Sequence, residues 1–470
     1  MAIELRPDQR EVAKRLVEML KTHPVVGFQA PTGWGKTPTV LEVIEELGAN
    51  PSLWLAPRLA IVHHVYVHAV RMNMRVIATA GRERLCAYNH SMVDFLRGAC
   101  NRCPLNRPVS INGLKYGSMD FGEVRSVAES LGVCPYRMQG VLERYGNYDL
   151  VISHYNRIQR LRALRPKLIV VDESHNVAIP RMHEVRAGAL EVILEKLGFE
   201  RDEINAYIRS PETLKVVLGE LIDSLVYIVE DVDDVLKPVV EELLSMVLGA
   251  QVWYYNETEG SIVGLELPSI ADITNTHSRV LFMSATLPPS LLSLPNVIVR
   301  RNWSIPVRLD ARYAITIETI QRRRDELVRY IGDKYLKPNT IVFTTSAREV
   351  LLSDRDEVVW EDELGSDPCQ YKEGIVALRV FGKYNEGVDI GCFDNVVVLG
   401  YPILPYAMER LKARGITEED FTTMVTTQII GRVTRTAERP MRIPNITLVD
   451  KRFKRITDKL RQYEIEVINA

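Results

Sequence analysis

The hydrophobic pattern opens with a helix and continues as short apolar runs separated by helical or irregular segments. Residues 1–24 carry apolar side chains at helical spacing on one face. Runs with the length and composition of buried strands follow at 25–28, 53–56, 75–79, 149–152, 168–171 and 279–283. Strands that alternate with helices favour a parallel, doubly wound sheet, in which ligands bind at the carboxyl ends of the strands.

A second alternating series follows in the last third of the chain. Its apolar runs lie at 340–344, 357–360, 375–380, 395–399 and 445–449. We interpret this series as a second α/β domain, joined to the first near residues 295–312.

Two segments interrupt the first sheet. Residues 81–146 are rich in Cys, Arg and Gly and have little strand character, whereas 180–260 carry apolar stripes typical of a helical subdomain with its own core. The predicted division is 1–80, 147–179 and 261–299 for the first domain, 81–146 and 180–260 for the two inserts, and 300–470 for the second domain.

The stretch from Ala30 to Thr37 reads APTGWGKT and lies between a predicted strand and a predicted helix. That context is typical of a phosphate-binding loop. Gly33 and Gly35 let the backbone N–H groups approach phosphate oxygens, at the positive end of the next helix. Lys36 is expected on the β- and γ-phosphates, and the Thr37 hydroxyl on magnesium.

Asp172 and Glu173 come directly after the apolar run 168–171. A carboxylate at that end of a strand can hold magnesium beside the phosphate loop, and the adjacent Glu173 can accept a proton from the attacking water. Asp at such a junction is also a common helix cap. The phosphate loop upstream favours the catalytic interpretation.

Gln428, Arg432 and Arg435 lie at i, i+4 and i+7, so all three share one helix face. Facing a bound triphosphate, they would form an arginine clamp on the charge of the γ-phosphate. A surface helix with salt bridges is the alternative. A loop with Gly387 and Asp389, predicted to face the same cleft, favours the functional interpretation.

The composition is that of an ordinary soluble protein. Of 470 residues 46% are hydrophobic and 26% charged, and the formal net charge of −2 means that any nucleic-acid surface must be local. The start lacks the apolar core of a secretory signal and no apolar window is long enough to cross a membrane, so we expect a cytoplasmic protein.

Eight short motifs occur along the chain in a characteristic order. APTGWGKT, LAPR, VVDESH, MSATL, IVFTTS, FGKYNEGVDI, QIIGRVTR and LVDKRF resemble the motifs of superfamily 2 helicases. The late motifs GKYNEGVDI and VDKRF, and a four-cysteine insert between the second and third blocks, resemble the XPD/DinG branch. The spacing Cys86-x13-Cys100-x2-Cys103-x30-Cys134 is similar to the iron–sulfur insert of archaeal XPD proteins.

The resemblance implies two RecA-like domains, the first carrying an iron–sulfur insert and a helical, arch-like insert. It implies ATP and magnesium as cofactors and movement 5′ to 3′ along single-stranded DNA. Gln9 joins the nucleotide-binding residues, and His175, Ser284 and Thr286 link hydrolysis to domain movement. DESH and SAT depart from the family pattern, and the helical insert looks shorter than the family's arch, which puts strand separation in doubt rather than hydrolysis.

The four clustered cysteines leave three interpretations open, namely a 4Fe–4S cluster, a zinc ion or buried thiols. One close C-x2-C pair and prolines after two of the cysteines favour the cluster, because zinc sites more often use paired C-x2-C units. A cluster would also hold together an insert too poor in apolar residues to fold alone. Cys369 and Cys392 stand apart and are predicted to be small buried residues.

Basic residues interleave with aromatic ones in the cysteine-rich insert, a pattern that suits a single nucleic-acid strand. Scattered arginines on a solvated surface are the alternative. Further candidates follow strands of the first domain: Arg58, Tyr155, Asn156 and Arg157.

These features predict an ATP hydrolase that acts as a DNA helicase or single-strand translocase in DNA repair or related processing. Its partners would be single-stranded DNA or a forked duplex, with repair or transcription proteins, and the chain would act as a monomer. The alternatives are an ATP-binding nucleic-acid scaffold and a remodeller of RNA or RNA–DNA hybrids.

Overall fold

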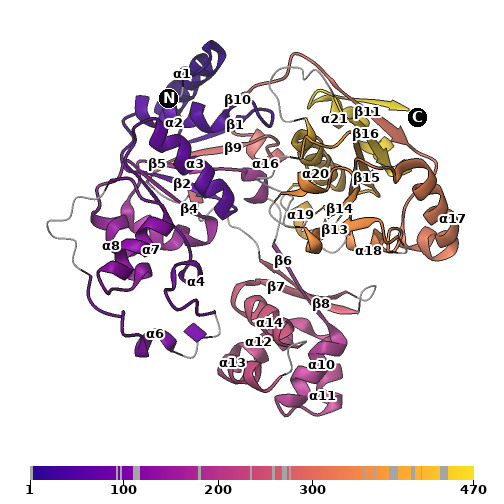
Figure 1. Cartoon of the computed structure of the whole chain (residues 1–470), viewed down its shortest axis with the longest axis horizontal. Helices are drawn as coiled ribbons and strands as arrows, with labels where there is room; N and C mark the ends of the chain where they lie inside the picture. Colours follow the sequence, from indigo (N-terminus) through magenta and orange to yellow (C-terminus); the bar gives the residue numbers. More distant parts are fainter. Residues whose placement is uncertain are drawn as a thin grey trace.

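A computed structural model describes residues 4–91, 94–95, 98–109, 117–177, 181–232, 236–256, 260–266, 273–274, 277–353, 355–364, 367–380, 390–403, 408–413, 415–434 and 443–469. Two seven-stranded parallel sheets form two α/β domains that lie side by side (Figure 1). This confirms the predicted fold class. In the described part of the chain, no helix has both the length and the apolarity needed to cross a bilayer.

The first sheet has the order β10-β1-β9-β5-β2-β4-β3. Its central strands β1, β9 and β5 are neighbours, so the three segments that follow them meet at one edge. The bounds are β1 Val25–Gln29, β2 Ser52–Ala56, β3 Val76–Ala78, β4 Leu150–His154, β5 Leu168–Val171, β9 Arg279–Ser284 and β10 Asn296–Ile298.

Different parts of the chain cover the two faces of this sheet. On one face, alternate strand residues pack against the first three helices, α1 Pro7–Thr22, α2 Lys36–Glu46 and α3 Leu59–Arg71. The other face is covered by helices of the cysteine-rich insert, α7 Phe121–Ser130 and α8 Pro135–Tyr145, together with α16 Pro289–Leu292. Half of the insert therefore belongs to the core of the first domain.

The rest of this insert contains the short helices α4 Arg82–Leu85 and α6 Ala99–Arg102. Among the described residues between 86 and 109, none is buried. Between β4 and β5 lie three further short helices, η1 Tyr155–Arg157, α9 Ile158–Leu161 and η2 Arg162–Leu164, and η3 Ser174–Val177 follows β5.

The second insert has its own hydrophobic core, built by five helices (Figure 1). It also contains a three-stranded antiparallel sheet, β6-β8-β7, which the helical stripes did not predict and which extends to Glu266, past the predicted boundary at 260. The bounds are β6 Arg181–Arg186, α10 Ala187–Lys196, α11 Arg201–Arg209, α12 Pro211–Glu220, α13 Ile222–Asp231, α14 Lys237–Gly249, β7 Val252–Asn256 and β8 Ser261–Glu266.

The second domain has the strand order β13-β14-β12-β15-β16-β11-β17. Helices cover both of its faces. The strands are β11 Ile305–Asp310, β12 Thr340–Thr344, β13 Val358–Trp360, β14 Ile375–Arg379, β15 Asn395–Leu399, β16 Asn445–Val449 and β17 Ile465–Asn469. The helices are α17 Ile317–Tyr335, α18 Ser346–Glu349, η4 Glu361–Glu363, η5 Pro368–Tyr371, α19 Met408–Ala413, α20 Glu418–Val433, η7 Lys451–Ile456 and α21 Thr457–Arg461.

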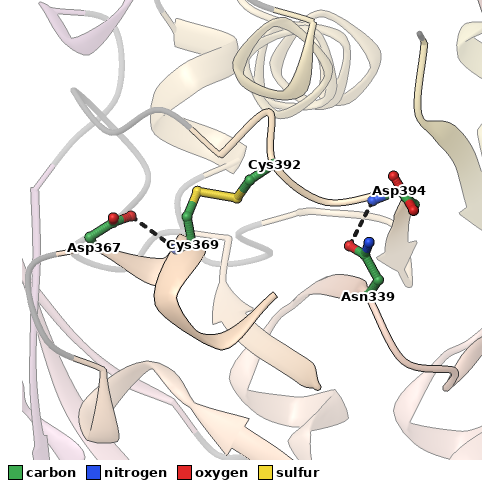
Figure 2. The surroundings of a disulfide bond; sticks show 5 residues. All are labelled: Asn339, Asp367, Cys369, Cys392 and Asp394. Carbon is green, nitrogen blue, oxygen red and sulfur yellow. Dashed lines mark hydrogen bonds between the residues drawn. A yellow bond between two sulfur atoms is a disulfide. The ribbon is translucent and has the colours of Figure 1, made fainter. Parts of the chain in front are cut away.

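Cys369 and Cys392 form a disulfide (Figure 2), so the prediction that they are separate, buried thiols is wrong. Both are half-buried, and the bond joins η5 to the segment that leads into β15. Two hydrogen bonds flank it, from Cys369 N to Asp367 Oδ1 (2.9 Å) and from Asp394 N to Asn339 Oδ1 (2.9 Å). The two cysteines lie 23 positions apart in the sequence, which is why periodicity gave no sign of the pairing.

Candidate nucleotide site between the two domains

The phosphate-binding loop connects β1 to α2 as predicted. Gly33 and Gly35 have φ angles of 80° and 100°, which side chains with a Cβ rarely adopt. The α-helix begins at Lys36, so its first N–H groups point out of the loop toward any bound anion. Lys36 Nζ donates to the Ala30 carbonyl (2.9 Å) and thus lies folded over the loop, and Thr37 is the next helical residue.

Gln9 supports this loop from behind. It is buried, its Nε2 donates to the Trp34 carbonyl (3.0 Å), and its Oε1 accepts from Arg6 N (2.9 Å). The Arg6 guanidinium donates to the same Trp34 carbonyl (2.9 Å). A Cβ at Gly35 would lie 2.1 Å from Gln9 Nε2, so this glycine is also required for packing.

Asp172 and Glu173 follow β5, beside the loop. Trp54 Nε1 donates to Asp172 Oδ2 (3.2 Å), and Glu173 N donates to Asp172 Oδ1 (2.8 Å). Burial, together with the neighbouring Glu173, raises the pKa of Asp172. Burial alone would also raise the pKa of Glu173, but the hydrogen bond and charge of His175, with the charges of Lys36 and Arg432, outweigh it and lower that pKa. Glu173 is therefore held ionised, as a proton acceptor must be.

Helix α20 of the second domain completes the site. All its residues from Phe421 to Val433 are buried, so it is not the exposed salt-bridge helix of the alternative interpretation. Gln428 Nε2 donates to Thr286 Oγ1 (2.8 Å) and lies 3.3 Å from His175 Nδ1. A Cβ at Gly431 would lie 2.8 Å from Thr32 Oγ1, so the helix touches the phosphate loop itself.

His175 lies at the centre of the contacts between the motifs. Its Nδ1 is 2.9 Å from Ser284 Oγ and 3.4 Å from Glu173 Oε2, and the Ser284 hydroxyl accepts from Thr286 N (3.1 Å). The loop after β9 is therefore connected both to the carboxylate motif and, through Gln428, to the second domain. Arg435, Gly387 and Asp389, which were predicted to join this site, lie outside the described residues.

The candidate nucleic-acid residues differ in their surroundings. Arg58 is half-buried at the start of α3. The Tyr155 hydroxyl donates to the Asp172 carbonyl, and Arg157 forms a buried ion pair with Glu143 (2.5 Å). Asn156 belongs to η1, but its side chain is outside the described part.

Cys86, Cys100, Cys103 and Cys134 line one cavity of about 30 Å³. All four are half-buried free thiols. Burial raises the pKa of Cys100, opposed by the charge of Arg82, and the other three cysteines act on the same thiol. In the described ranges, no three His, Cys, Asp or Glu side chains are grouped closely enough to hold a metal ion. Four cysteine thiols around one cavity are a donor set that suits a metal centre bound by thiolates.

Arginines and aromatic rings surround this cavity. The Arg82 guanidinium lies 5.3 Å from the centre of the Phe95 ring and 5.1 Å from the centre of the Tyr136 ring. The Arg160 guanidinium lies 4.6 Å from the centre of the same Tyr136 ring. Sequence reasoning missed Arg160 and Glu143, which lie in segments with no motif. Their only signal was the density of charged residues around η1 and α8.

Comparisons with known proteins agree with this architecture. Residues 2–95 match the family model described as "Type III restriction enzyme, res subunit". No curated protein matches the sequence. A solved XPD helicase is 18% identical over all of both chains, with a TM-score of 0.69. Xpd4 of S. tokodaii (18%, TM-score 0.57) and an apo form of XPD (16%, TM-score 0.61) each match 98% of this chain and 100% of their own.

These solved structures match nearly the whole of this chain, at identities and TM-scores that establish the fold. The chain therefore has the two-domain fold of the XPD helicases.

Proposed function

We propose that this protein hydrolyses ATP to move along, and separate, strands of nucleic acid. The observation that carries the proposal is the position of α20: Gln428 reaches Thr286 of the first domain, and the charge of Arg432 acts on Glu173. A triphosphate held by Lys36 and Thr37 would thus lie between a magnesium ligand, Asp172, a base, Glu173, and a cation from the other domain. Opening and closing of this site moves the two domains relative to each other.

The experiment is phosphate release with and without single-stranded DNA. Lys36→Ala removes the phosphate contact and Glu173→Gln removes the base, so each should lower kcat by about 10²- to 10⁴-fold. Glu203→Gln, in α11 of the second insert, is the matched control for the second change and should retain full activity. Full hydrolysis by purified Glu173→Gln would remove the assignment of the base.

We propose DNA as the substrate and 5′ to 3′ as the direction. Support comes from the XPD fold and from the arginines and aromatic rings around the cysteine cavity, which suit stacking of a single strand. Strand displacement on duplexes with 5′ or 3′ tails tests direction, and matched RNA tails test the sugar. Hydrolysis stimulated equally by RNA, or displacement only on 3′ tails, would contradict these assignments.

We also propose that the four cysteines hold a 4Fe–4S cluster. A tetrahedral zinc ion with Zn–S bonds of about 2.3 Å draws four sulfurs to within about 4 Å of one another. The four thiols line one cavity, and their sequence, with a single close C-x2-C pair, supports the cluster over the ion. Chemical analysis for iron and sulfide tests this. About four iron atoms per chain, lost in Cys103→Ser, are expected; one zinc atom per chain would refute the cluster.

A further inference from the structure

Tyr155 is tied to the catalytic motif rather than exposed at its edge. Its hydroxyl donates to the Asp172 carbonyl, which belongs to the peptide that joins Asp172 to Glu173. The N–H of the same peptide donates to Asp172 Oδ1 (2.8 Å). Both polar groups of this one peptide are therefore held by side chains.

The peptide needs such support because Glu173 has a φ angle of 46°. A residue with a side chain avoids this left-handed region, since its Cβ approaches the following carbonyl. A non-glycine residue remains there only where its surroundings over-determine the conformation. The hydroxyl of Tyr155 therefore fixes the backbone that aims the Glu173 carboxylate.

Two and five residues after Tyr155, the same segment contacts the cysteine-rich insert through Arg157 and Arg160. Arg157 Nη2 donates to Glu143 Oε1 (2.5 Å), and both side chains are buried. Glu143 belongs to α8, and Arg160, in α9, packs against the same helix with its Nε 3.8 Å from Glu143 Oε2. A Cβ at Gly140 would lie 2.1 Å from Arg160 Nη2, so this arginine occupies the space that the glycine leaves open.

Helix α8 leads directly to the thiols. It begins immediately after Cys134, and Tyr136 in its first turn lines the cysteine cavity. The Tyr136 ring has Arg160 at 4.6 Å and Arg82, another residue of the cavity wall, at 5.1 Å. Hydrogen bonds, two ion pairs to Glu143, two cation–π contacts to Tyr136 and the backbone from Tyr155 to Arg160 thus connect the Asp172–Glu173 peptide to the wall of the cysteine cavity.

We propose that Tyr155 is a positioning residue for Glu173, and that the segment from Tyr155 to Leu161 couples the nucleotide site to the cysteine-rich insert. The inference rests on the proposed ATP site. Nucleotide binding that shifts the Asp172–Glu173 peptide pulls on Tyr155, and Arg157 and Arg160 transmit the shift to α8. Coupling of this kind requires a continuous packed network, which these contacts supply.

Two variants cut the network at different places. Tyr155→Phe removes only the hydroxyl that holds the peptide. Gly140→Ala displaces the end of the Arg160 side chain from α8, leaves Tyr155 intact, and favours the helix because Ala is the better helix former. Tyr207→Phe, in α11 of the second insert, is the matched control for loss of a tyrosine hydroxyl.

The first measurement is hydrogen–deuterium exchange of α8 in the full chain, with and without AMP-PNP. In the parent protein and in Tyr207→Phe, AMP-PNP should change α8 exchange by roughly 3- to 30-fold. In Tyr155→Phe and Gly140→Ala that change should disappear while the Kd for AMP-PNP stays within about twofold. An equal change in all four proteins, or none in a parent protein that binds AMP-PNP, overturns the coupling. A parent protein that does not bind AMP-PNP overturns the proposed function itself.

The second measurement separates positioning from coupling. Because Tyr155 aims the base, Tyr155→Phe should lower kcat by about tenfold and leave KM unchanged. Gly140→Ala should keep the parent kcat, since Glu173 stays in place. A Tyr155→Phe variant with the parent kcat overturns the positioning role, even where α8 still responds to AMP-PNP.

Discussion

The two inserts of the first domain are stabilised in different ways where they extend beyond the main sheet. The second insert buries leucines, isoleucines and valines of its own between five helices and a small sheet. In the first, the described residues between 86 and 109 bury no side chain at all, and four thiols face a common cavity instead. A segment without a core must be held by bonds of another kind, which is the role of a structural metal centre.

The contrast also appears inside the first insert. Helices α7 and α8 pack Val124, Met138 and Leu142 on the sheet of the first domain, so they are held by ordinary burial. The segment from Cys86 to Cys103 shares none of that core. We therefore expect only this segment, and not the whole insert, to depend on the thiols.

The largest effect should come from removing the proposed metal centre. Structural metal sites contribute on the order of 10 kcal/mol to folding, so Cys103→Ser or chelation should unfold residues 86–109. Limited proteolysis should then cut that segment, while α10–α14 stay intact because their core is untouched. The control is Cys392→Ser, which breaks the disulfide of the second domain and should leave the protease resistance of residues 86–109 unchanged. Equal resistance of Cys103→Ser and the parent chain would show that the segment needs no metal.

The second insert should instead be sensitive to loss of apolar volume. Leu194 is fully buried in its core, and Leu194→Ala should cost roughly 3–5 kcal/mol through lost burial and the cavity that remains. Hydrogen exchange should report this loss in α10–α14 alone. The exposed Val192, on the same helix, is the control: Val192→Ala should change stability by less than about 0.5 kcal/mol. Equal effects of the two changes would contradict an independent core.

The sequence predicted buried strands well, because continuous apolar runs require burial on both faces. Nine predicted strands have the observed bounds or differ by one residue at one end, among them 168–171 and 340–344. In the two main sheets, β10, β11 and β17 were missed. Strands β10 and β17 lie at sheet edges and have exposed positions, and β11, inside its sheet, alternates buried and exposed residues. None of the three therefore shows a continuous apolar run.

Motif spacing singled out Lys36, Glu173 and Gln428 as site residues. In the structure the charges of Lys36 and Arg432 act on Glu173, and Gln428 contacts Thr286 of the first domain. Arg157 and Tyr155 were predicted to lie on the path of the nucleic acid; in the structure Arg157 pairs with Glu143, and the Tyr155 hydroxyl donates to the Asp172 carbonyl. The direction in which a polar side chain points depends on the element packed beside it. The local sequence around the residue does not specify which element that is.

The disulfide adds a covalent link to a segment that also contributes buried residues to the core of the second domain, and its removal should have an intermediate effect. Cys369–Cys392 closes a loop of 23 residues in the second domain, and a loop of this size contributes about 3 kcal/mol through the entropy of the unfolded chain. Cys369→Ser should therefore lower the free energy of unfolding of the second domain by about that amount. Denaturant titration under non-reducing conditions measures it.

A reductant supplies the control for that titration. It should destabilise the parent chain to the level of Cys369→Ser and leave the variant unchanged. A parent chain that is insensitive to reductant would mean that the bond contributes nothing to stability.

The smallest effect is expected where the first insert relies on ordinary helix chemistry. Asp120 caps α7: its Oδ1 accepts from Glu123 N (2.8 Å), and Glu123 Oε2 accepts in return from Asp120 N (2.7 Å). Asp120→Ala should cost about 1 kcal/mol, while Asp120→Asn, which keeps a capping oxygen, should cost a few tenths. Because α7 belongs to the core of the first domain, neither change should release metal or expose residues 86–109 to protease. Loss of metal in Asp120→Ala would mean that α7 and the thiol segment fold as one unit, and the division of the insert into a packed half and a metal-held half would fail.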